Sequence, residues 1–374
     1  SLVGLPYVYR IFWGPILDRY SLGSMGKRRS WILAMQVLLL IGFNIMAWFR
    51  PEQHPNLLAL FALILACFSA TQDIAVDAYR VDVLKHDERG LGAALSIEGY
   101  RIAMIASGGF ALILADRIGW QLTYLCMAGL MCVGIIATLF APPIIRNNNT
   151  SSKNLSQLII ESFLDFLLRK KAWLILLLII TYKLGDAFSH ALSTTFLLDL
   201  EFSLTEVGII NKVLGVIATL CGVLVGGLFM TRVGLYKALL TFGVLAAVTN
   251  LTYMLLAMTG KNLEIACAAV FVENVCAGMG TAAFVALLMS LCNPKYTATQ
   301  FALLSSLAAL GRVYVGPISG YLVQGIGWAG FYCFSAAAAV PGLLLLIYLR
   351  SYLDSRSVTA DKTSSENLDM ASKA

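Results

Sequence analysis

Long apolar runs separated by short polar and basic stretches make up most of the chain. Most of these runs are about 20 residues or longer, and a helix of that length is sufficient to cross a lipid bilayer. The pattern therefore predicts an all-α polytopic membrane protein. We expect eleven spans, at about residues 1–17, 31–49, 56–80, 90–115, 120–141, 172–198, 205–230, 236–259, 262–291, 297–324 and 328–350.

The composition agrees with a membrane protein and argues against several other classes. Of the 374 residues, 59% are hydrophobic and 13% are charged, whereas soluble domains carry about 25% charged residues. The eight cysteines show neither a CxxC pair nor metal-ligand spacing, so we expect no disulfide and no metal site. The sequence has no Walker A motif and no Ser/His/Asp set, which predicts neither an enzyme nor a bound cofactor. The net charge of +6 lies mainly in short loops beside the spans, so we expect no nucleic-acid partner.

Basic residues gather in alternate loops, and this asymmetry predicts the topology. The loops after the first, third, seventh and ninth spans and the long middle loop hold most of them, which places these loops in the cytoplasm. The chain starts at Ser1, inside an apolar run and without a Met. We therefore expect a further helix upstream, the first of twelve spans with both ends in the cytoplasm.

A polar middle loop divides the spans into two groups, which suggests two bundles related by an internal repeat. We expect an N-terminal bundle at residues 1–141 (spans 2–6), a cytoplasmic linker at residues 142–171 and a C-terminal bundle at residues 172–350 (spans 7–12). The linker contains an amphipathic stretch at residues 155–168. Residues 351–374 are polar and rich in charge, which predicts a disordered cytoplasmic tail.

Charged residues inside the spans recur at every third helix. With the upstream helix counted as the first, one basic residue falls in each of spans 2, 5, 8 and 11, and an acidic residue falls in each of spans 4, 7 and 10. These residues are Arg10, Arg101, Lys212 and Arg312 in the basic series and Asp73, Asp186 and Glu273 in the acidic series. Three-helix units repeated four times are the organisation of major facilitator transporters, so we predict that fold.

The helical rise places the buried charges about 14 to 21 Å from the cytoplasmic ends of their spans, near the middle of the membrane. Arginines there can bind a carboxylate or phosphate through paired hydrogen bonds, and buried carboxylates can take up protons. We predict a central cavity for a large anionic or zwitterionic solute, with proton coupling. The candidate substrate-path and proton-path residues are Arg10, Gln72, Asp73, Asp77, Glu98, Tyr100, Arg101, Tyr182, Lys183, Asp186, Lys212, Glu273 and Arg312.

The same charges also have a structural interpretation, as fixed ion pairs that hold helices together. Glu98 with Arg101, and Lys183 with Asp186, are spaced to pair along one helix. His190 lies one turn beyond Asp186 and could relay protons, although a hydrogen-bonded structural role is the commoner one for a helical His. The sequence leaves both interpretations open.

The loop after span 2 combines small, acidic and basic residues. Its candidate gating residues are Gly14, Asp18, Arg19, Arg28 and Arg29. A Gly permits two helices to approach closely, while Asp and Arg can pair across the cytoplasmic mouth. The loop resembles the signature loop of the major facilitator superfamily, and this resemblance implies a role in gating rather than in substrate binding.

Several motifs together resemble the AmpG-type muropeptide permeases of bacterial inner membranes. The most specific are T-Q-D-x-x-V-D-A at residues 71–78 and Y-K-L-G-D-A-F at residues 182–188; others lie at residues 4–7, 14–19, 88–94, 99–101, 107–109, 206–208 and 211–212. The resemblance implies uptake of N-acetylglucosaminyl-1,6-anhydro-N-acetylmuramyl peptides from periplasm to cytoplasm, by alternating access and proton symport. It further implies roles in cell-wall recycling and β-lactamase induction, and we expect a monomer embedded in the inner membrane.

Two other functions compete with muropeptide uptake. The acetyl-CoA transporters, a sister branch of the superfamily, resemble this family in sequence, but a phosphate-rich ligand favours denser Arg clustering than this chain has. A non-transporting membrane receptor or scaffold would need a soluble output domain, and the longest loop and the tail are too short for one. Transport of another large anion, such as acetyl-CoA, therefore stays as the alternative.

Overall fold

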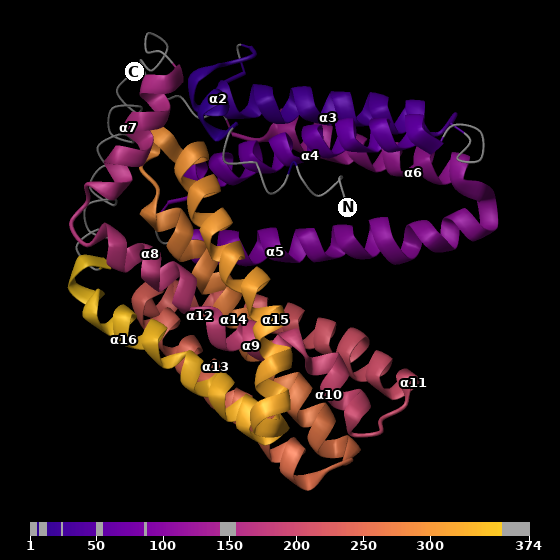
Figure 1. Cartoon of the computed structure of the whole chain (residues 1–374). Coiled ribbons are helices and arrows are strands. Elements are labelled where there is room, and N and C mark those ends of the chain that lie inside the picture. Colours follow the sequence, from indigo (N-terminus) through magenta and orange to yellow (C-terminus); the bar gives the residue numbers. More distant parts are fainter. Residues whose placement is uncertain are drawn as a thin grey trace. The chain divides into compact units, whose positions relative to one another are not determined.

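The computed structural model describes residue 6 and residues 13–23, 25–49, 55–85, 88–142 and 155–353. Regular structure in these residues is helical throughout (Figure 1). Two π-helical segments, Ala106–Phe110 and Gly208–Leu214, precede α6 and α12, and a 3-10 turn, η5 (Pro294–Tyr296), precedes α15. The α-helices are α2 (Gly14–Arg19), α3 (Lys27–Met46), α4 (Pro55–Val83), α5 (Arg89–Ile105), α6 (Ala111–Phe140), α7 (Leu155–Leu167), α8 (Ala172–Thr181), α9 (Leu184–Ala191), α10 (Ser193–Asp199), α11 (Leu204–Val207), α12 (Gly215–Val233), α13 (Leu235–Thr259), α14 (Leu263–Leu291), α15 (Thr297–Ala338) and α16 (Val340–Tyr348).

Eight helical segments in the described residues are long and apolar enough to cross a membrane. They are Lys27–Met46, Asn56–Val83, Leu114–Phe140, Ala172–Asp199, Gly208–Val233, Leu235–Thr259, Leu263–Leu291 and Ile318–Tyr348. The protein is therefore a multi-pass membrane protein, as the apolar runs predict. The expected spans at residues 90–115 and 297–324 are helical but not among the eight, and the expected span at 1–17 lies largely outside the described residues. The count of eleven spans stays a prediction.

Two glycines mark places where a long helix changes direction. Gly119 in α6 has a φ of 80° and Gly327 in α15 has a φ of 67°. Glycine adopts this left-handed region without the steric cost that a Cβ would add. The sequence predicts span boundaries at residues 115–120 and 324–328, and the chain turns within both intervals.

The expected span at residues 172–198 is interrupted, whereas the sequence pattern predicts one continuous helix. It consists of α8, α9 and α10, with breaks at Lys183 and at Leu192. A hydrogen bond from Ser335 Oγ to the carbonyl oxygen of Gly185, 2.8 Å long, holds the segment just after the first break. Broken spans of this kind occur at substrate and ion sites in transporters, where irregular backbone lines a cavity.

The chain divides into two compact units. Unit 1 comprises Ser1–Leu84, Gly99–Leu168 and Cys292–Leu303, and unit 2 comprises Lys85–Glu98, Arg169–Leu291 and Leu304–Ala374. In unit 1, α3 packs against both α4 and α6 (Figure 1). Leu39 and Met46 of α3 are buried against Leu65 of α4, while Ile41 and Ile45 are exposed. Exposed apolar side chains on such helices suit contact with lipid.

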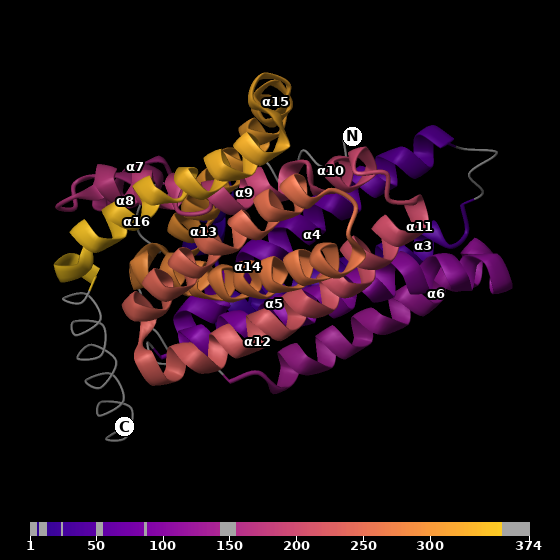
Figure 2. The same ribbon diagram turned by 90° about the horizontal axis from the view of Figure 1, so that it is seen from below.

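In unit 2, α14 is the central helix and runs alongside α12 and α13 (Figure 2). The contact between α12 and α14 depends on glycine. A Cβ on Gly222 would lie 2.1 Å from the carbonyl oxygen of Val275, and a Cβ on Gly278 would lie 2.5 Å from that of Thr219. Small residues allow membrane helices to approach until their backbones touch, and dispersion contacts then hold them together.

A capping box fixes the start of α11. The backbone N–H of Ser203 donates to Glu206 Oε2 over 2.7 Å, and the N–H of Glu206 donates to Ser203 Oγ over 3.2 Å. This reciprocal pair satisfies two donors at the helix start. The hydrogen bonds from Ser203 lower the pKa of Glu206 below its ordinary value. The resemblance motif at residues 206–208 therefore has a local structural role.

Candidate functional site

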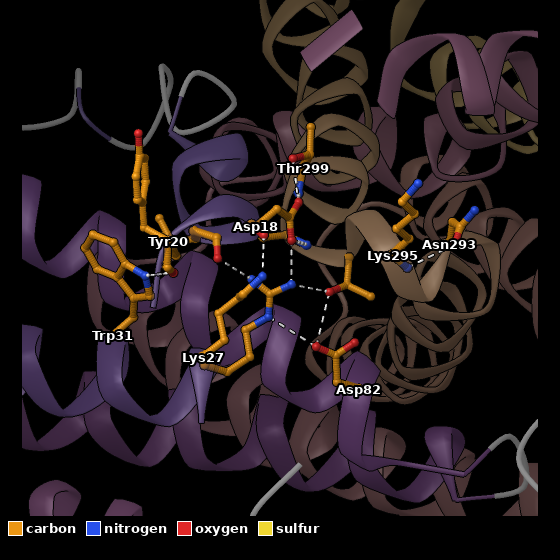
Figure 3. Close-up of polar contacts among 12 residues, drawn as sticks. Asp18, Tyr20, Lys27, Trp31, Asp82, Asn293, Lys295 and Thr299 are labelled. Carbon is orange, nitrogen blue, oxygen red and sulfur yellow. Dashed lines mark hydrogen bonds and ion pairs between the residues drawn. The ribbon is translucent and has the colours of Figure 1, made fainter. Parts of the chain in front are cut away.

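A buried polar cluster in unit 1 joins α2, α3 and α4 to the start of α15. This Asp18 cluster consists of Asp18, Arg28, Asp82, Thr297 and Thr299, and Figure 3 shows Asp18, Asp82 and Thr299 converging on it from three helices. Asp18 is 1% exposed and Arg28 is 7% exposed. Arg28 Nη2 lies 2.5 Å from Asp18 Oδ1, and Arg28 Nε lies 3.1 Å from Asp82 Oδ2. One buried cation thus lies between two carboxylates.

Asp18 also binds the N-terminus of α15. The backbone N–H groups of Ala298 and Thr299 donate to its two carboxylate oxygens over 3.3 and 2.9 Å, and the Thr299 hydroxyl donates over 2.6 Å. The first N–H groups of a helix have no partner within the helix, and the positive end of its dipole favours an anion. Gly14 permits this approach, because a Cβ there would lie 3.0 Å from Thr299 Cα.

Arg28 uses its remaining donors to complete the cluster. Its Nη1 donates to the carbonyl oxygen of Leu17 over 3.0 Å, and its Nη2 donates to Thr297 Oγ1 over 2.7 Å. A guanidinium carries five N–H donors in a planar fork, which suits several acceptors around one buried charge. Asp18 and Arg28 belong to the predicted gating loop, whereas Asp82 and Thr297 do not.

The other two predicted gating residues have different partners. Arg29 is buried and donates to the carbonyl oxygens of Thr138 and Leu139, over 3.2 and 2.8 Å, at the C-terminal end of α6. A cation is favourable there because the last carbonyls of a helix are unpaired. Arg19 lies over the ring of Tyr20, with its Cζ 5.0 Å from the ring centroid. The structure therefore brings Gly14, Asp18 and Arg28 together and places Arg19 and Arg29 elsewhere.

The linker helix α7 contacts the start of α15 and the turn η5 before it. Asp165 accepts hydrogen bonds from Asn293 Nδ2 over 3.0 Å and from Gln300 Nε2 over 2.8 Å. Glu161 accepts one from the Tyr296 hydroxyl over 2.9 Å. Residues 292–303 thus contact Asp18 of α2 and the acidic residues of α7 within one unit.

We expect Asp165→Asn to loosen α7, because the substitution removes the charge that two amide groups contact. Hydrogen bonds to a charged group contribute about 1.5 to 3 kcal/mol, so local opening should rise by about tenfold or more. Hydrogen–deuterium exchange of the α7 amides measures this opening. Asp116→Asn, at an exposed position of α6, is the matched control and should leave the exchange unchanged. Equal protection of α7 in both variants would contradict the assignment.

The predicted path residues of unit 1 lie on α4 and α5. Asp77 forms an ion pair with Arg80 one turn later in α4. Asp73 is exposed, and Gln72 is half-buried with an Oε1 that accepts no hydrogen bond from a described residue. On α5, Tyr100 is 67% exposed and Arg101 is half-buried.

The remaining predicted path residues outside the α9–α14 region are Arg10, Glu98, Lys212 and Arg312. Glu98 is half-buried and belongs to unit 2. Arg10 lies outside the described residues, and the side chains of Lys212 and Arg312 lie outside them as well. Their roles on the path stay predictions.

In unit 2 the predicted path residues Lys183, Asp186 and Glu273 gather with His190, and we call these four the α9–α14 cluster. Lys183 pairs with Asp186 one turn later, and Lys183 Nζ lies 3.5 Å from the carbonyl oxygen of Ala277. His190 Nε2 lies 3.1 Å from Glu273 Oε1. The Glu273 side chain is 2% exposed and the His190 side chain is 43% exposed. Two acid–base pairs thus meet where the span is broken.

Tyr182 has a packing environment beside this cluster. Its hydroxyl donates to the carbonyl oxygen of Leu239 over 2.8 Å, and its ring stacks on Phe284 at a centroid distance of 5.6 Å. Behind α9, Asn250 Nδ2 donates to Ser335 Oγ over 3.1 Å, and Ser335 in turn holds the carbonyl of Gly185. These contacts from α13 and α15 fix the position of the broken span.

The comparison with known families identifies the fold. A sequence model described as Major Facilitator Superfamily matches residues 5–316 and, in a second match, residues 191–369. The chain belongs to the major facilitator superfamily.

Known relatives narrow this assignment. The chain is 51% identical over 356 residues to the anhydromuropeptide permease of Escherichia coli K12, covering 95% of this chain and 72% of that protein. It is 36% identical to a putative transporter AmpG 4 of Rickettsia conorii, covering 94% of this chain and 87% of that protein. Within the superfamily the chain belongs to the AmpG-type permeases, so it is a transporter and not an enzyme.

Solved structures agree with the fold. The Escherichia coli fucose:proton symporter aligns with a TM-score of 0.72 at 10% identity, over 93% of this chain and 90% of that one. A bacterial homologue of the iron transporter ferroportin, in an outward-facing state, aligns with a TM-score of 0.65 at 15% identity, over 94% and 89%. At these identities the likeness shows the major facilitator fold alone.

The sequence does not reveal several residues of the AmpG-type chain that the structure places at these sites. Asp82 and Thr297 join the Asp18 cluster, and Glu161 and Asp165 bind the start of α15. The partners in these contacts are 54 to 269 residues apart, so no local motif connects them. A weak signal exists for Thr297, because Pro294 just upstream is typical of a helix start.

Proposed function

We propose that this protein imports anhydromuropeptides from the periplasm into the cytoplasm, by alternating access and proton symport, in the inner membrane of a bacterium. The 51% identity with an anhydromuropeptide permease, extending over 95% of the chain, is the observation that carries this proposal. Such a family relation at high coverage favours the same substrate class, namely N-acetylglucosaminyl-1,6-anhydro-N-acetylmuramyl peptides. The expected arrangement is a monomer of two six-helix bundles that needs no cofactor.

The chemistry of the charged residues supports an anionic sugar-peptide as substrate. Lys183 in unit 2 and Arg101 in unit 1 can each bind a peptide carboxylate. Tyr100 is an exposed aromatic beside Arg101 and offers a ring against which a sugar can stack. The carboxylates Asp73, Asp77, Glu98, Asp186 and Glu273 are the candidate proton sites.

We further propose that the Asp18 cluster is a cytoplasmic gate. Residues Cys292–Leu303 group with unit 1, whereas α15 from Leu304 onward groups with unit 2. Release of the start of α15 must therefore break the contacts with Asp18 and Arg28. A buried ion pair of this kind resists separation, because each charge loses its partner. Alternating access would open and re-form these contacts once in each cycle.

Uptake by reconstituted protein tests the proposed function. Labelled anhydromuropeptide should accumulate in proteoliposomes when the outside is made acidic, and a protonophore should abolish the accumulation. Unlabelled anhydromuropeptide should compete for uptake, while acetyl-CoA should not. Folded protein that neither binds nor exchanges anhydromuropeptide would refute the substrate, and competition by acetyl-CoA would favour the alternative.

A further inference from the structure

Glu273 is a buried acid. Among the described ionisable residues, His190 lies within hydrogen-bond distance of it. It lies in the middle of α14 with its side chain 2% exposed, and its Oε1 is 3.1 Å from His190 Nε2. His190 lies in the last turn of α9 and is 43% exposed. The pair thus combines one group that water can reach with one that water cannot.

The charges of the described groups around Glu273 do not balance without an additional proton. On α9, Lys183 and Asp186 pair with each other and cancel. The other described titratable neighbours are two phenols and a thiol, which carry no charge near neutral pH: Tyr253 from α13, Cys276 from α14 and Tyr332 from α15. With His190 neutral, the four members of the α9–α14 cluster carry a net charge of −1, and one proton brings the net charge to zero. A buried carboxylate without a countercharge is costly, so these described side chains favour uptake of one proton.

The position of His190 indicates the side from which the proton arrives. Lys183 and Asp186 are about 17 to 21 Å from the cytoplasmic end of α8 at helical rise, and His190 lies about 6 Å beyond Asp186. With α8 starting at the cytoplasmic face, His190 lies toward the periplasm. The imidazole is 43% exposed, which allows it to exchange protons with water on that side.

We propose that His190 and Glu273 together form the proton-binding site that couples transport, with His190 receiving the proton and Glu273 storing it. A hydronium ion on the periplasmic side transfers its proton to Nδ1 of His190 and leaves a water molecule. The Nε2 proton then moves to Oε1 of Glu273, which leaves a neutral imidazole and a neutral carboxylic acid. The site gains one proton and no other bond changes. This assignment rests on the proposed proton symport and selects one of the candidate carboxylates.

Two transport assays on the full chain separate proton coupling from substrate binding. Glu273→Gln mimics the protonated acid, so gradient-driven accumulation of anhydromuropeptide should fall to the level of empty liposomes. Counterflow, in which labelled substrate exchanges for unlabelled substrate without a gradient, should stay at the wild-type level. His190→Gln should change the pH dependence of accumulation. Glu264→Gln, at an exposed position of the same helix, should behave as wild type in both assays.

Normal accumulation by Glu273→Gln would exclude this site, and loss of accumulation with retained counterflow in Asp73→Asn alone would move the site to α4. A second measurement tests the site without any substrate, so it remains valid if the substrate assignment is wrong. Infrared difference spectra between acidic and alkaline pH should contain the C=O band of a buried carboxylic acid. That band should vanish in Glu273→Gln, and its persistence would contradict the proposal even if wild-type protein transports no muropeptide.

Discussion

Asp18→Asn should reduce muropeptide uptake by at least about tenfold, because it breaks a buried ion pair. Asp18 accepts hydrogen bonds from Arg28, from two backbone N–H groups and from the Thr299 hydroxyl. An amide has one acceptor oxygen, and its NH₂ group would face other donors. Removing one partner of a buried pair costs about 3 to 5 kcal/mol. The substitution therefore destabilises the state in which the start of α15 is bound to Asp18.

Uptake into proteoliposomes measures the transport defect, and the rate of cysteine labelling measures how often the start of α15 is released. Cys292 is 7% exposed and is the first residue of the segment 292–303, so it should react faster with a maleimide in Asp18→Asn than in wild type. The labelling uses a background in which the other cysteines are replaced by Ser. Asp116→Asn is the matched control for both readouts. Wild-type uptake and unchanged labelling of Cys292 would exclude a gating role for Asp18.

Gly222→Ala should lower the thermal unfolding temperature of the protein by about 1 to 4 °C. The new methyl group would meet the Val275 carbonyl oxygen at 2.1 Å, and backbone atoms cannot rotate away as a side chain can. Either α12 and α14 separate, or the carbonyl leaves its helical hydrogen bond. Overpacking of this type typically costs about 1 to 3 kcal/mol and occasionally more.

Thermal unfolding in detergent, followed by circular dichroism, measures the change. Gly129→Ala is the matched control, since a Cβ at Gly129 in α6 would meet no atom within 4 Å. Ala is favoured over Gly inside a helix by about 1 kcal/mol, so the control should hold or slightly raise the unfolding temperature. Equal unfolding temperatures for the two variants would show that the α12–α14 contact adapts to the added methyl group.

The sequence predicts features that depend on local pattern. Apolar run length identifies the membrane helices, and the chain turns at Gly119 and Gly327 within the predicted interspan intervals. Lys183 and Asp186 are three residues apart, and the structure pairs them. These features need no knowledge of distant parts of the chain.

Features that depend on contacts between distant parts of the chain could not be predicted from the local sequence pattern. The break at Lys183 lies in a stretch with no proline, and just after it the carbonyl of Gly185 accepts a hydrogen bond from Ser335, which is 150 residues further along the chain. The pairing of Glu273 with His190 could not be predicted for the same reason. His190 is 83 residues away on another helix, and the sequence contains many other acidic and basic residues that could form the pair. Helical periodicity gives the face of a residue but not the helix opposite it.

The main-chain donors at the start of α15 have an evolutionary consequence. Every amino acid except proline supplies a backbone N–H, so the hydrogen bond from position 298 to Asp18 does not depend on which side chain stands there. Ala298 is 1% exposed and packs with Leu17 and Ile74, so packing limits position 298 to small residues. Across homologues we therefore expect the acid at position 18 to be nearly fixed and position 298 to vary only among small residues. Covariation between the two positions should be absent although they touch, because one of them is recognised by a group that mutation does not alter.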